Sequence, residues 1–172
     1  IENLLNNSTV GEANTVSGGY ADARYITRKV ILAEGQDAED LLVYLDAYKP
    51  PGADVKVYYK VLHREDSDVF SQARWIEMDQ LTSTTTISAS ENKDDFREYQ
   101  YGVKDYPSGV ESGLFDSGLF GNTSPTNILS YRNSVRGFYT GFKYFALKIV
   151  LTGTSTTNPP RVKNLRAIAL QK

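Results

Sequence analysis

The residues that most often carry catalysis are scarce in this chain. His63 is the only histidine among 172 residues, and there is no cysteine. A zinc site needs several nitrogen, sulfur or carboxylate ligands, and a nucleophilic triad needs a histidine beside a nucleophile and an orienting group. No second histidine and no cysteine can complete either arrangement. We therefore interpret His63 as a histidine at the end of a strand, without a catalytic role.

A short acidic segment offers a different chemistry. Glu65, Asp66 and Asp68 follow closely on Leu62, and Ca²⁺ takes carboxylate and carbonyl oxygens from such loops. The segment lacks the glycine and the distal glutamate of an EF-hand loop. The default interpretation is a solvated acidic turn, and Ca²⁺ binding is left open.

Further along the chain, four carboxylates stand close together in sequence, namely Asp94, Asp95, Glu98 and Asp105. Glycoside hydrolysis needs two carboxyl groups about 5 to 9 Å apart, and closeness in sequence does not establish such a separation. A hydrolase is therefore the last of the alternatives. We predict no catalytic residue, no metal ligand and no cofactor.

Aromatic side chains are the third candidate, as a surface for sugars. The chain has 12 tyrosines, and tyrosine suits both strands and binding surfaces because it joins a large apolar ring to a polar tip. Rings exposed on one face beside carboxylates and amides would favour glycan binding, whereas the same rings buried between sheets would favour a structural role. The candidates for stacking on a glycan are Trp75, Tyr99, Tyr101, Tyr106 and Tyr139.

The elements that position these residues are strands, and residues 41–62 show this most clearly. Side chains of a strand point alternately to opposite faces, and both halves of this stretch alternate in that way. The residues between the halves, 49–54, contain two prolines and a glycine and predict a loop. The simplest interpretation is an antiparallel pair, although a crossing between two packed sheets would look the same. One face carries Leu41, Val43, Leu45, Ala47, Val55, Val57, Tyr59 and Val61.

Similar patterns recur along most of the chain. We predict strands at 24–33, 96–103, 142–151 and 162–170, with Ile26, Val30 and Leu32 on the inner face of the first, and a brief strand or helical turn near 75–78. Many strands, long connections and almost no helical periodicity indicate an all-β fold, an antiparallel β-sandwich of jelly-roll type. Residues 1–22 lack periodicity and predict a linker or an irregular N-terminal arm, which leaves 23–172 as the sandwich domain.

Residues 104–137 have the most irregular sequence, and within them SGLF occurs twice, at 112–115 and 117–120. A long glycine-rich loop that carries exposed apolar side chains is either covered by a partner or tucked onto its own core. Under the first interpretation, the partner-binding residues are Leu114, Phe115, Leu119 and Phe120.

Composition excludes several classes of partner. The net charge is −2, and Lys and Arg are scattered, so we expect no nucleic acid. No apolar run approaches the roughly 18 residues of a membrane-spanning helix, so we expect no membrane.

Five blocks of the sequence, in order, carry a resemblance. They read ARYITRKV at 23–30, DLLVYLDAYKP at 40–50, VKVYYKVL at 55–62, FALKIVL at 145–151 and PRVKNLRAIAL at 160–170. Together they resemble a domain near the C-terminus of large virion structural proteins of contractile-tailed bacteriophages, notably T4-like phages of cyanobacteria and other marine bacteria. The resemblance spans residues 23 to 170, and 104–137 is its least familiar part.

This resemblance implies a non-enzymatic virion component that acts in particle assembly, as part of the tail, the baseplate or the fibre attachment. It implies no active-site residues, and its partners would be other virion proteins. A homo-oligomer is the usual arrangement for such parts. The alternative is a carbohydrate-binding or host-receptor-binding module of a tail fibre, with a host surface glycan as its partner.

Overall fold

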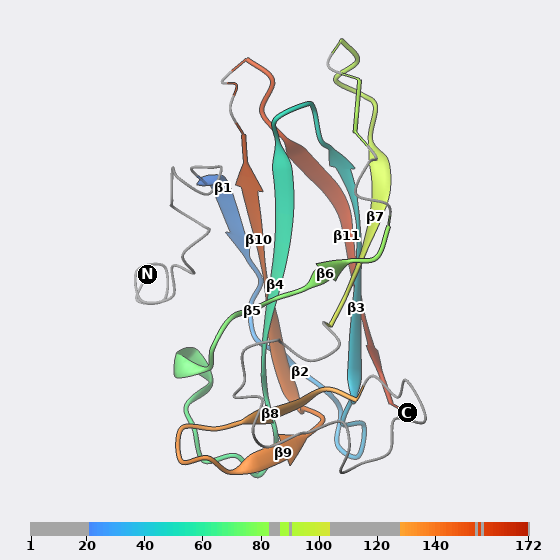
Figure 1. The fold of residues 1–172 in the computed structure, drawn as a ribbon. Coiled ribbons are helices and arrows are strands. Elements are labelled where there is room, and N and C mark those ends of the chain that lie inside the picture. Colours follow the sequence, from blue (N-terminus) through green and yellow to red (C-terminus); the bar gives the residue numbers. More distant parts are fainter. Residues whose placement is uncertain are drawn as a thin grey trace, which may run out of the picture.

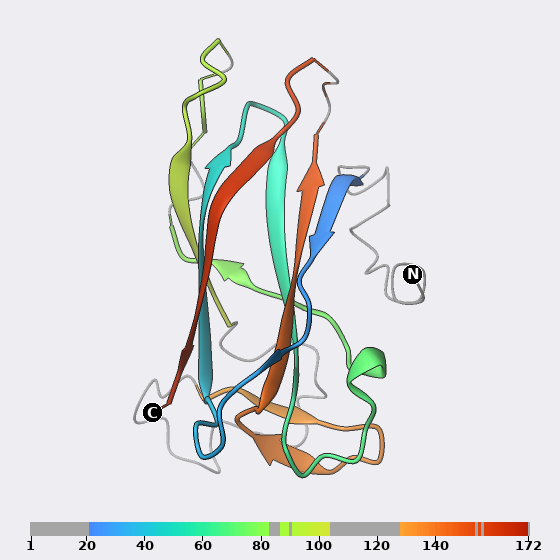
Figure 2. The ribbon, with the colours of Figure 1, turned by 180° about the vertical axis from the view of Figure 1, so that it is seen from behind.

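The computed structural model describes residues 21–82, 87–89, 91–103, 128–153, 155 and 157–171. Over this part the chain is all-β, with eleven strands and one 3-10 turn, Phe70–Gln72. Two antiparallel sheets pack face to face as a sandwich (Figures 1 and 2). The predicted all-β sandwich is thus confirmed, and its jelly-roll type remains a prediction.

The first sheet has the strand order β1-β10-β4-β5, with β2 also paired to β10. The strands are β1 (Ala21–Ile26), β2 (Val30–Ile31), β4 (Asp54–Leu62), β5 (Ile76–Glu77) and β10 (Tyr144–Thr152). The second sheet has the order β11-β3-β7-β6. Its strands are β3 (Asp40–Tyr48), β6 (Asp79–Gln80), β7 (Arg97–Gly102) and β11 (Arg161–Leu170). A separate hairpin of β8 (Ser130–Arg132) and β9 (Phe138–Thr140) lies at one end of the sandwich, at the bottom of Figure 1.

The central stretch forms two strands, as predicted, but they do not pair with each other. β3 belongs to the second sheet and β4 to the first, so the loop at 49–53 crosses between the sheets, and the simpler interpretation as a hairpin was wrong. The crossing has the pattern of a type II turn, because Gly52 has φ 81° and the Ala53 N–H donates to the Pro50 carbonyl at 3.0 Å. Apolar and polar side chains alternate in both strands because their apolar faces meet across the sandwich.

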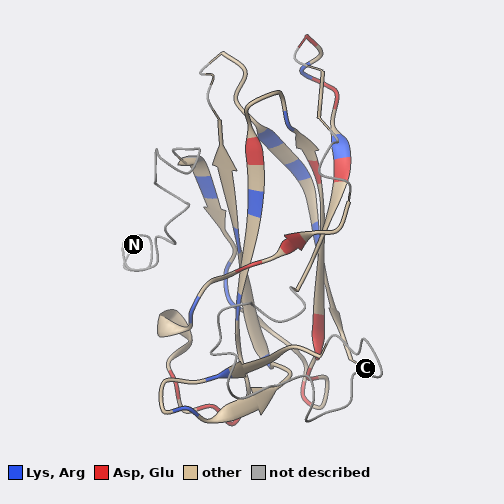
Figure 3. Cartoon of the chain, viewed as in Figure 1, with Lys and Arg blue, Asp and Glu red and all other residues tan. Residues whose placement is uncertain are grey.

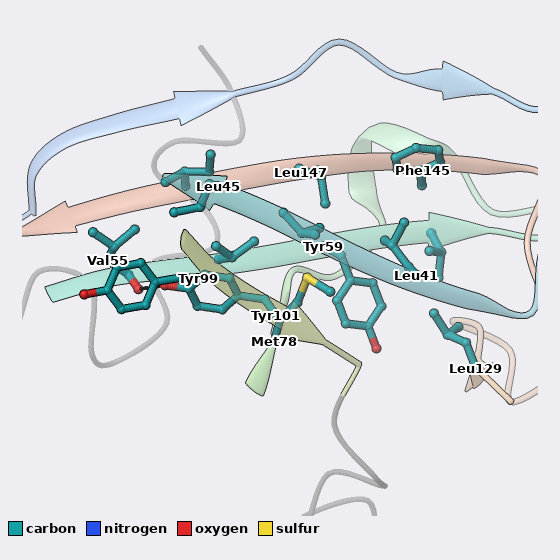
Figure 4. Close-up of a cluster of buried hydrophobic side chains, with 14 of the residues drawn as sticks. Leu41, Leu45, Val55, Tyr59, Met78, Tyr99, Tyr101, Leu129, Phe145 and Leu147 are labelled. Atoms are coloured by element: carbon teal, nitrogen blue, oxygen red, sulfur yellow. Dashed lines mark hydrogen bonds between the residues drawn. The ribbon is translucent and has the colours of Figure 1, made fainter. Parts of the chain in front are cut away.

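Side chains from both sheets fill the space between them. Figure 4 shows this core, to which β7 contributes Tyr99 and Tyr101 and β4 contributes Val55 and Tyr59. The Tyr101 hydroxyl donates to the Val55 carbonyl at 2.8 Å, so this buried polar group is satisfied inside the core. Burial raises the pKa of Tyr59 and of Tyr101, because the phenolate would lose its hydration.

The outer face of the first sheet is also covered. Trp75 packs there on Tyr58 of β4 and on Ala146 and Val150 of β10. Two lysines of the same face, Lys60 and Lys148, are buried beneath the ring of Trp75, with their ammonium groups 4.9 and 5.1 Å from its centroid. These contacts favour the cations, whereas burial opposes them.

The first predicted strand, 24–33, is divided into β1 and β2, and its inner face was partly wrong. Ile26 pairs with Lys148 and Val30 pairs with Phe145, so the register shifts by one residue between them. Because of that shift the two side chains point to opposite faces of the sheet, and both are more than a third exposed on an edge strand. Leu32 packs against the core as expected.

Candidate functional site

Most of the aromatic residues proposed for glycan stacking are not on an open face. Trp75, Tyr99 and Tyr101 are 3%, 0% and 2% exposed, and rings so covered offer no face to a sugar. Tyr139 is half-buried and stacks on His63, with ring centroids 5.3 Å apart, and on Tyr131 at 5.8 Å. The structure therefore does not bring these rings together into one exposed platform. Tyr106 lies outside the described residues.

The acidic segment after β4 has a structural role that the sequence did not reveal. Asp66 is buried and accepts hydrogen bonds from the Tyr131 hydroxyl at 2.8 Å and from the Asn133 amide at 2.9 Å. Asp68 accepts from the N–H and the hydroxyl of Ser134, at 2.7 and 2.5 Å. The two carboxylates thus hold the β8–β9 hairpin to the end of the sandwich.

These bonds also decide the ionisation of Asp66. Burial alone would raise the pKa of this carboxyl, but the hydrogen bonds from Asn133, from the Asp68 N–H and from Tyr131 outweigh burial and lower the pKa. Among the described residues, no group of three or more His, Cys, Asp or Glu side chains could hold a metal ion.

Of the carboxylates considered for hydrolysis, Asp95 and Glu98 have separate partners and Asp94 is exposed. Asp95 accepts from the Ala89 N–H at 2.8 Å and pairs with Arg97 at 3.1 Å, which lowers the pKa of Asp95. Glu98 pairs with Arg166 of β11 across the outer face of the second sheet. Asp105 and the four residues predicted to bind a partner, Leu114, Phe115, Leu119 and Phe120, lie outside the described residues.

An exposed apolar edge stands out on the first sheet. The chain from 21 to 32 runs beside β10. Between β1 and β2, Thr27 remains bonded to β10, because its N–H donates to the Leu147 carbonyl at 2.9 Å. On its other side this segment has no strand partner among the described residues. Its apolar side chains reach solvent, with Tyr25 59% and Ile31 58% exposed and Ile26 and Val30 less so. We call these four residues the β1/β2 edge.

The edge of the second sheet exposes less apolar surface, since Ile168 is 43% exposed. β11 also lacks a strand partner on its outer side in the described part of the chain, and it carries Arg161, Lys163 and Arg166. Its pairing to β3 is irregular between Lys163 and Arg166, where Asn164 has φ 53°. Charges and a bulge on an edge strand hinder pairing with another chain. Figure 3 shows that elsewhere acidic and basic residues are interspersed along the strands.

Comparisons with protein-family models, with curated proteins and with solved structures find no match. Within the described part of the chain, no helix is long and apolar enough to cross a membrane. Among the described residues, the β1/β2 edge is a candidate site that none of the predictions named. The sequence contains a signal for it. Two apolar pairs, Tyr25-Ile26 and Val30-Ile31, flank the polar residues 27–29.

Proposed function

We propose that this chain is a non-enzymatic structural module of a contractile-tailed bacteriophage virion, which acts in the assembly of the tail, the baseplate or the fibre attachment. The proposal is supported by the five ordered sequence blocks and by the sandwich that they build. The single observation that carries it is the β1/β2 edge, where a strand edge without a partner among the described residues coincides with exposed apolar side chains.

The two edges of the sandwich differ in how much apolar surface they expose. An open strand edge presents unpaired N–H and C=O groups, and proteins that do not use such an edge blunt it with charges, bulges or covering segments. Both edges carry exposed basic residues and an irregular register. They differ in apolar exposure: Tyr25 and Ile31 of the β1/β2 edge are 59% and 58% exposed, whereas Ile168 of β11 is 43% exposed. The ammonium group of Lys29 lies over the ring of Tyr144, 5.1 Å from the centroid. We infer that a strand of another subunit adds to this edge.

The proposed occupant is a second copy of the chain. Repeated parts of an assembly are usually related by symmetry, and a two-fold axis lets one strand edge pair with its own copy. Strand addition would supply main-chain hydrogen bonds and would cover the four apolar side chains. Contacts to other virion proteins would then use other surfaces of the module.

The test is the mass in solution, measured by light scattering over a range of protein concentrations. Ile31→Lys places a charge in the edge, and Ile168→Lys, at an exposed position on β11, is the matched control. We expect the unaltered chain and the control to form the same oligomer and Ile31→Lys to be a monomer. Deleting residues 1–20, just before β1 begins at Ala21, separates any contribution of the arm. A chain that is monomeric at every concentration would overturn self-assembly through this edge.

The alternative function, a glycan-binding module of a tail fibre, has lost its main sequence argument, because three of its five aromatic candidates are buried.

A further inference from the structure

A cavity of about 430 Å³ lies where the chain crosses between the two sheets. One wall is the β3–β4 crossing with Lys49 and Asp54, and the other is the β5–β6 crossing with Glu77 and Asp79. Pockets for small molecules commonly measure about 300–1,000 Å³ and combine apolar walls with a few fixed polar groups. Because both walls are chain crossings anchored in the sheets, the cavity is part of the framework of the fold.

The polar groups of the cavity are held in place by one another. The Lys49 ammonium is 2.6 Å from an Asp54 carboxylate oxygen and 3.4 Å from the Gln80 amide oxygen. The Lys56 ammonium is 3.6 Å from a Glu77 carboxylate oxygen, and this ion pair joins the two walls. These groups therefore already sit in one arrangement, and a ligand would not have to order them.

The balance of charge selects the class of ligand. Two lysines and three acidic residues, Asp54, Glu77 and Asp79, line the cavity, so an anion would meet a surplus of carboxylates. A cationic side chain would face two ammonium groups and could use only the acceptors. A neutral polyhydroxy ligand can use both, because each hydroxyl donates to a carboxylate or amide oxygen and accepts from an ammonium group.

The apolar part of the lining fits the same class. Ile87 lines the cavity and is 47% exposed, so its side chain can contact the C–H face of a sugar ring. We propose that this cavity binds a neutral saccharide unit, a mono- or disaccharide of a larger glycan. The proposal stands apart from the assembly role, because it uses neither the β1/β2 edge nor an oligomer.

The test is a titration of the full chain with glucose, galactose, mannose, N-acetylglucosamine, maltose and cellobiose, followed by amide chemical shifts in NMR spectra. We expect at least one sugar to give saturable shifts that are confined to residues 49–56, 76–80 and 87. Asp79→Ala should weaken that binding by about tenfold, as expected for loss of one charge-assisted hydrogen bond. Asp94→Ala, which removes an exposed carboxylate outside the cavity lining, should leave it unchanged.

Three results would overturn the proposal: no saturable shift with any of these sugars, shifts that centre elsewhere, or equal weakening by both variants. An arginine methyl ester that binds the cavity in place of every sugar would also overturn it and would indicate a basic protein segment as the occupant. Since monomers and oligomers both serve in the titration, failure of the assembly proposal would not be confused with failure of this one.

Discussion

Replacing Asp66 with alanine should loosen the β8–β9 hairpin and destabilise the whole domain. The substitution removes three hydrogen bonds, from Tyr131 at 2.8 Å, from Asn133 at 2.9 Å and from the Asp68 N–H at 3.0 Å. A hydrogen bond to a charged group contributes about 1.5–3 kcal/mol. The three contributions will not add fully, because water can reach the donors once the hairpin moves.

We therefore expect the free energy of unfolding to fall by about 3 kcal/mol, which for a chain of this size corresponds to a decrease in Tm of about 6–12 °C. Urea denaturation followed by circular dichroism measures the first quantity, and a thermal scan measures the second. Amide shifts of residues 130–140 in NMR spectra report whether the hairpin has left the sandwich. Glu65→Ala is the matched control, since Glu65 is an exposed neighbouring carboxylate.

The effect of Asp66 should depend on pH. Its pKa is lowered in the folded state, so its stabilisation is present above the pKa of an unfolded aspartate, about 3.9, and is lost as the pH falls through the lower folded value. The difference between the unaltered chain and Asp66→Ala should thus shrink below about pH 4. A loss under about 0.5 kcal/mol at pH 7, the usual size for a surface substitution, with unchanged hairpin shifts, would refute the assigned role.

Two further perturbations test other parts of the fold. Gly35 and Gly141 have almost the same backbone conformation, φ 73° and 74°, but a Cβ at Gly141 would lie 2.8 Å from the Ala38 carbonyl oxygen, whereas one at Gly35 would meet nothing. In urea denaturation, Gly35→Ala should lower the free energy of unfolding by about 1 kcal/mol, and Gly141→Ala should lower it by clearly more. Equal losses would show that the Ala38 carbonyl does not crowd the added Cβ. Burial and the charge of Lys148 lower the pKa of Lys60, so Lys60→Met should stabilise at pH 7 by about 1 kcal/mol. That gain should shrink as the pH rises through the lowered pKa of folded Lys60 and vanish above the unfolded value of about 10.4, where Lys60 is neutral in both states. A net loss at pH 7 would show that the contacts of its cation outweigh burial.

Local patterns predicted the strands well, because alternation reports directly which side chains a sheet buries. Residues 41–62 are the clearest case: Leu41, Val43 and Leu45 are fully buried, as their spacing indicated. Alternation does not say which sheet a strand joins. The pairing of β3 and β4 was therefore open, and the crossing at 49–53 decided it.

Long-range contacts explain what the sequence could not show. The role of Asp66 depends on Tyr131 and Asn133, more than sixty residues away, so the acidic segment looked like a solvated turn. Lys60 alternates like an exposed residue but is buried by Trp75, which lies outside the sheet. Ile26 and Val30 point to opposite faces because of a one-residue register shift, which no local pattern indicates.

Hydrogen exchange at β1 tests the central claim most directly. Thr27 donates its N–H to β10, and because N–H groups alternate along a strand, that of Ile26 points to the open edge. We predict that the Ile26 amide exchanges rapidly at protein concentrations where the chain is monomeric and becomes protected where light scattering detects an oligomer. An oligomer in which the Ile26 amide continues to exchange rapidly would contradict strand addition at the β1/β2 edge.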